Sequence, residues 1–84
     1  MNRKYSLDNE DFTLLQSYLG GETFSSLVLS VSIPDTPKIE VYHLKHTTLC
    51  LMDKKLDIFA RNEITIRETA SYLEEVCGIK LKDK

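Results

Sequence analysis

The segment Thr48–Ala60, with the sequence TLCLMDKKLDIFA, decides the fold because it predicts a β-hairpin joined by Asp53 and Lys54. A two-residue loop at this point places the apolar residues of both strands on one face. The predicted cross-strand pairs are Leu51 with Leu56, Leu49 with Ile58, Cys50 with Asp57, and Thr48 with Phe59. A longer loop that includes Lys55 is the alternative, because Asp-Lys is a weaker turn signal than Asp-Gly or Asn-Gly.

The segment Thr65–Gly78, TIRETASYLEEVCG, predicts a helix with a signal at each end. Thr65 and Glu68 have the spacing of a capping box, so we expect the helix to begin at Ile66. Gly78 is placed to end it in the left-handed conformation. Its apolar stripe follows the helical period and consists of Ile66, Ala70, Leu73 and Cys77.

Residues 9–19 predict a second, N-terminal helix. Asp8 is the candidate N-cap, because Leu7 and Phe12 occupy the two positions of a hydrophobic staple around it. Gly20 is expected to end this helix in the left-handed conformation. Its apolar stripe is formed by Phe12, Leu15 and Leu19, widened by Leu14 and Tyr18.

Two further strands are expected between the N-terminal helix and the hairpin. Residues 25–33 place Leu27, Leu29, Val31 and Ile33 on one face and Ser26, Val28, Ser30 and Ser32 on the other, which is typical of a half-buried strand. Residues 34–37 then break the chain with two prolines. A second strand then starts near Lys38, with Ile39 opposite Ile33 and Val41 opposite Val31. The apolar pattern changes face at Tyr42 and Leu44, which indicates either a bulge or a second, partly covered face.

These elements predict an α+β domain: an N-terminal helix, a three- to four-stranded antiparallel meander and a C-terminal helix. Both helices should cover one face of the sheet, giving a two-layer sandwich. We expect a single domain over residues 1–84, with residues 1–6 and 80–84 frayed. The other sheet face would be exposed, and its candidate partner-binding residues are Tyr42, Leu44, Met52, Phe59, Glu40 and Asp57.

Composition excludes several classes of function. A net charge of -2 argues against broad attraction to nucleic-acid backbones, and no apolar run approaches the ~20 residues of a membrane-spanning helix. Acidic residues stand where a signal peptide would have its apolar stretch, so we expect a cytoplasmic protein. Two cysteines are too few for a disulfide scaffold, and reduced, packed thiols are expected.

No group of residues predicts catalysis or a cofactor. His43, His46 and Cys50 are the nearest approach to a metal site, but positions 43 and 46 of a strand point to opposite faces. Cys50 and Cys77 lack a neighbouring base, and the clustered carboxylates fit helix ends and solvated helix faces. We therefore expect neither an enzyme nor a metal or cofactor site.

The sequence favours a small intracellular protein-binding module. It would act as an inhibitor, adaptor or accessory subunit through its exposed sheet face or an edge strand, as small proteins of phages and other mobile elements often do. One alternative is a platform for single-stranded nucleic acid, with Tyr42 and Phe59 stacking on bases. The basic residues available to it would be Lys38, Lys45, Lys54, Lys55 and Arg61. A second alternative is a homodimeric structural protein without a further ligand.

Overall fold

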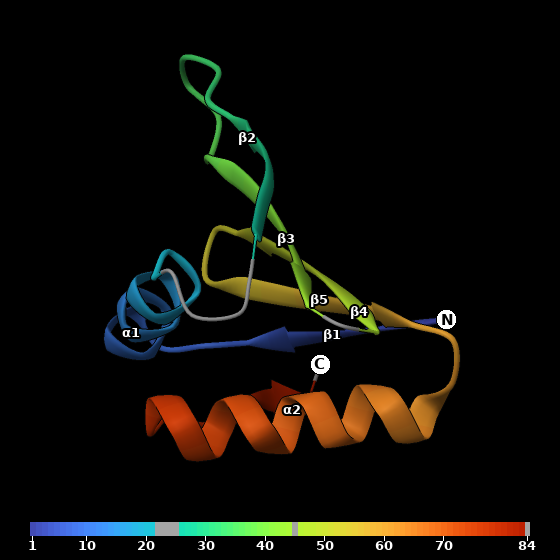
Figure 1. The fold of residues 1–84 in the computed structure, drawn as a ribbon. Helices are drawn as coiled ribbons and strands as arrows, with labels where there is room; N and C mark the ends of the chain where they lie inside the picture. Colours follow the sequence, from blue (N-terminus) through green and yellow to red (C-terminus); the bar gives the residue numbers. More distant parts are fainter. Residues whose placement is uncertain (22–25, 45, 84) are drawn as a thin grey trace.

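A computed structural model describes residues 1–21, 26–44 and 46–83, and for residues 26–29 and 31 it describes the backbone. It confirms the predicted α+β class, with an antiparallel sheet and two helices (Figure 1). The elements are β1 Asn2–Ser6, α1 Asn9–Leu19, β2 Ser26–Val31, β3 Ile39–Leu44, β4 Thr47–Met52, β5 Lys55–Ala60, α2 Glu63–Cys77 and β6 Lys82–Asp83.

The sheet has six strands in the order β2-β3-β4-β5-β1-β6, and every neighbouring pair is antiparallel. The expectation that residues 1–6 and 80–84 are frayed is wrong for 2–6 and 82–83. β1 pairs along its whole length with β5, because Tyr5 lies opposite Leu56 and is buried beside it. β6 is held against β1 by the Arg3–Asp83 ion pair at 3.0 Å. Residue 84 lies outside the described residues.

The β4–β5 hairpin has the predicted loop and the predicted register. Asp53 and Lys54 have φ values of 48° and 62°, the two left-handed positions that a type I′ turn requires. All four predicted cross-strand pairs are present. The alternative loop through Lys55 is wrong, because Lys55 already pairs with Met52.

The core lies between the sheet and the two helices. α2 runs along one face of the sheet, and α1 lies near one end of α2 (Figure 1). The fully buried side chains of this layer come from the two helices, β4 and β5: Leu15, Leu19, Leu49, Leu51, Leu56, Ile58, Ile66 and Leu73. Leucine and isoleucine side chains from both halves of the chain therefore pack together between the sheet and the helices.

β3 faces the opposite way from the prediction. Glu40 and Tyr42 were expected on the exposed face, yet they are 9% and 2% exposed and lie under the helices. The reason is the β3–β4 register, which pairs Tyr42 with Leu49 and Glu40 with Leu51, because residues paired across a sheet share a face. Leu44 follows on the same face and packs against the core.

The β2–β3 register also differs from the prediction. Ile39 pairs with Val31 instead of Ile33, and a bulge interrupts β2 opposite Tyr42. Ile33 is 57% exposed, because the amide and the hydroxyl of Thr36 both donate to its carbonyl oxygen and draw it into the loop. The predicted alternation of residues 25–33 falls largely on side chains outside the described ones.

The helix ends match the prediction in part. α1 spans the predicted residues, but Gly20 has a right-handed φ of -75°, so its predicted left-handed conformation is wrong. α2 begins one turn earlier than predicted, because the Asn62 side chain is its cap and accepts from the Thr65 amide at 2.8 Å. Gly78 has the predicted left-handed conformation, with a φ of 67°.

Candidate functional site

The sheet face turned away from the helices carries an apolar patch. Two neighbouring cross-strand pairs form it, Ile39 with Met52 and Val41 with Cys50. Met52 is 39% exposed, and the other three side chains are half-buried. Ile39, Val41, Cys50 and Met52 are called the sheet patch below. Both helices of the described chain lie on the opposite face, so neither covers the patch.

Polar residues border the sheet patch on the β5 and β1 side. Lys55 pairs with Met52, Asp57 pairs with Cys50, and Lys4 pairs with Asp57 in turn. The Asn2 side-chain amide donates to Asp57 Oδ1 at 2.8 Å, which fixes that carboxylate at the border. A small hollow of about 170 Å³ lies among Lys4, Cys50, Met52, Lys55 and Asp57. An apolar centre with a charged rim on one side is a typical arrangement for a protein interface.

The structure divides the six predicted partner-binding residues between the two faces. Met52, Phe59 and Asp57 lie on the open face, whereas Glu40 and Tyr42 lie in the core. Leu44 is half-buried beside that core. Ile39 and Val41 were missed as open-face residues, although pairing Leu44 with Thr47 would have placed them opposite Met52 and Cys50 of β4.

Glu40 is the centre of a buried polar cluster. Its carboxylate accepts from Gln16 Nε2 at 2.9 Å and from the Tyr42 hydroxyl at 2.9 Å, while Lys38 Nζ lies 3.8 Å away. Burial, followed by the hydrogen bond to Glu40, raises the pKa of Tyr42 to about 12. The cluster joins α1 to β3 and satisfies its own polar groups, so its role is structural.

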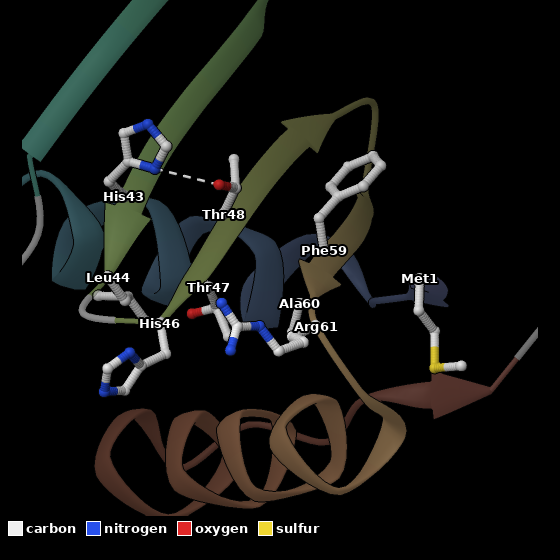
Figure 2. A pocket seen from close by; sticks show the side chains of 9 residues that line it. All are labelled: Met1, His43, Leu44, His46, Thr47, Thr48, Phe59, Ala60 and Arg61. Carbon is white, nitrogen blue, oxygen red and sulfur yellow. Dashed lines mark hydrogen bonds between the residues drawn. The ribbon is translucent and has the colours of Figure 1, made fainter.

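A second hollow, of about 480 Å³, lies where β3 and β5 end and β4 begins (Figure 2). It is called the sheet-end hollow below. Nine residues line it: Met1, His43, Leu44, His46, Thr47, Thr48, Phe59, Ala60 and Arg61. His43 and Phe59 stand on either side of Thr48, His46 points towards α2, and the Arg61 side chain ends beside Thr47. The Thr48 hydroxyl and His43 Nδ1 are 3.0 Å apart.

The cysteines and histidines do not assemble into a reactive or metal-holding group. Cys50 and Cys77 are both free and half-buried, and burial raises the pKa of each thiol, which disfavours the thiolate. Within the described parts of the chain, no three His, Cys, Asp or Glu side chains come together in a way that could hold a metal ion.

Comparison with known proteins adds no relative. No family model, curated protein or solved structure matches the chain. Neither α1 nor α2, the two helices that the structure describes, has the length and apolar character needed to cross a membrane.

Proposed function

We propose that the chain is a small protein-binding module that acts as an inhibitor, adaptor or accessory subunit through its open sheet face. The observation that carries this proposal is the sheet patch, an apolar surface on two central strands that the helices leave uncovered. Removing such a surface from water favours association, by roughly 25 cal/mol per Å² of apolar area.

The strand at the edge of the sheet supports the same proposal. β2 carries no charged residue and pairs only with β3 in the described sheet, so its outer backbone groups are available to a partner strand. Figure 1 shows the β2–β3 hairpin rising away from the helices. A partner that adds a strand to β2 would extend the sheet beside the face that carries Ile39 and Val41.

The predicted nucleic-acid platform has less support. It was predicted to stack bases on Tyr42 and Phe59, but Tyr42 is buried on the helix side, so these two rings do not share the open face. Lys45 lies outside the described residues, and Lys38 is engaged with Glu40. Protein binding is therefore the function that the open face supports best.

A tagged pull-down from source-cell lysate tests the proposal. We expect a stoichiometric protein that survives both nuclease treatment and high-salt washing, because an apolar interface does not depend on counterion release. Met52→Asp should abolish this capture. Leu14→Asp is the matched control, because Leu14 is 49% exposed on the outer side of α1, away from the patch. The absence of any stoichiometric protein after these washes, whether or not nucleic acid is recovered at low salt, would contradict the proposal.

Size-exclusion chromatography with light scattering separates a foreign partner from a second copy of this chain. A dimer of the purified protein that dissociates on Met52→Asp and captures nothing else would favour the homodimer alternative. A monomer that still captures its target would favour the proposed inhibitor or adaptor.

A further inference from the structure

The sheet-end hollow has an uncompensated positive side. Of the nine described residues that line it, none is acidic, whereas Arg61, His43 and His46 all contribute nitrogen donors. Arg61 has no ion-pair partner among the described residues, unlike Arg3 and Arg67, which both contact Glu63. A free guanidinium at the rim of a hollow is suited to an oxyanion, and above all to a phosphate, because its forked donors match phosphate oxygens.

A smaller hollow, which adjoins the sheet-end hollow at His46, limits where an anion would lie. It has a volume of about 300 Å³ and is lined by Glu68 as well as His46 and Tyr72. The carboxylate of Glu68 would repel a phosphate there. Another hollow lies near the start of α2 and is lined by His46, Arg61, Asn62 and Thr65. The favourable place for a phosphate is therefore between His46 and Arg61.

The other side of the sheet-end hollow fits a planar ring. His43, Thr48 and Phe59 form one cross-strand row, because His43 pairs with Thr48 and Thr48 pairs with Phe59. Two strand spacings put the backbones of His43 and Phe59 about 10 Å apart, with the small Thr48 side chain between them. Figure 2 shows the two rings standing on either side of that threonine. Phe59 is 42% exposed, so its ring is available for stacking.

We propose that the sheet-end hollow binds a nucleoside monophosphate unit, with the base between His43 and Phe59 and the phosphate between Arg61 and His46. The volume of about 480 Å³ is within the range of small-ligand sites. The unit has two possible sources, a free nucleotide or one residue of a single strand, and both offer the same phosphate and base. The His43–Thr48–Phe59 row lies on the same open face as the sheet patch, next to its Val41–Cys50 pair, but the proposed ligand does not depend on the proposed protein partner.

NMR titration of the full chain tests the proposal, with adenosine 5′-monophosphate, adenosine, inorganic phosphate and a short single-stranded oligoadenylate as probes. We expect the monophosphate to shift the signals of His43, Thr48 and Phe59 saturably, with adenosine and phosphate each much weaker. An oligonucleotide that binds tighter and weakens steeply with salt would identify a nucleic-acid strand as the source. A monophosphate that binds at least as tightly would identify the free nucleotide.

Arg61→Gln should weaken monophosphate binding about tenfold, because it removes a charged hydrogen-bond donor from the phosphate. Lys54→Gln removes the same charge at the opposite end of the hairpin and should leave the affinity unchanged. Two results would overturn the proposal. One is the absence of saturable shifts with either the monophosphate or the oligonucleotide at about 1 mM. The other is an equal response to inorganic phosphate, which would show that the base contributes nothing.

Discussion

Replacing Tyr42 by phenylalanine should destabilise the protein by about 2 kcal/mol. The substitution keeps the ring, which is 2% exposed, and removes only the hydroxyl that donates to Glu40 Oε2 at 2.9 Å. A hydrogen bond to a charged group contributes about 1.5–3 kcal/mol, and Glu40 would keep its bond from Gln16. For a chain of this size the loss corresponds to a fall in Tm of about 8–16 °C.

Urea denaturation followed by far-UV circular dichroism measures this loss. Tyr5→Phe is the matched control: Tyr5 is also buried in the core, but its hydroxyl has no hydrogen-bond partner among the described residues. We expect the control to lose less than about 0.5 kcal/mol. Equal effects of the two substitutions would refute the assigned geometry of the Tyr42 side chain.

A harsher substitution separates the two possible orientations of β3. If Tyr42 lay on the open face, as the sequence predicts, Tyr42→Asp would leave the fold intact. In the structure it places a second carboxylate under the helices beside Glu40, without the partners that Glu40 has. An unpaired buried charge costs more than a marginal domain can lose, so we expect the variant to be unfolded. A folded Tyr42→Asp protein would contradict the structure and support the predicted orientation, with Tyr42 on the open face.

Three further outcomes are expected. The pKa of Tyr42 is raised to about 12 in the folded protein, above its ordinary 10.0. Its contribution to stability is therefore complete below pH 10 and is lost as the pH rises through 12. The free energy of unfolding should fall less steeply with pH above 10 in Tyr42→Phe than in the unchanged protein, as measured by urea denaturation. Gly78→Ala should cost about 1 kcal/mol, measured by urea denaturation, because its φ of 67° strains any side chain. Asn62→Ala should cost about 1 kcal/mol and exceed the effect of Thr65→Val, because Asn62 is the cap of α2. The reverse order in urea denaturation would favour the capping box at Thr65.

Local sequence patterns predicted the β4–β5 hairpin because its loop and its two apolar faces agree on one register. The same is not true of β3, where Ile39 and Val41 are apolar on one face while Tyr42 and Leu44 are apolar on the other. Such a strand does not by itself select a face, and its neighbour β4 makes the choice. As a result Glu40 is buried, although the sequence pattern predicted it on the exposed face.

The site depends on long-range pairing that local patterns do not reveal. β1 contains only Tyr5 as a buried residue, too little to predict a strand, and its place in the sheet comes from pairing with the distant β5, as in the pairs of Asn2 with Phe59 and Ser6 with Lys55. The sheet-end hollow likewise collects residues from the ends of β3 and β5 and the start of β4. Met52, Asp57 and Phe59 were placed correctly because they belong to the well-specified hairpin.

Oxidative footprinting of the two methionines tests the central claim, that the open sheet face is the binding surface. Met52 lies in the sheet patch and Met1 lies outside it, and their exposed fractions are 39% and 71%. Methionine oxidation follows exposure and is read directly by mass spectrometry. The account predicts that, in the complex recovered by the pull-down, Met52 becomes protected while Met1 oxidises as in the free protein. Oxidation of Met52 at the same rate in the free and bound protein would contradict it.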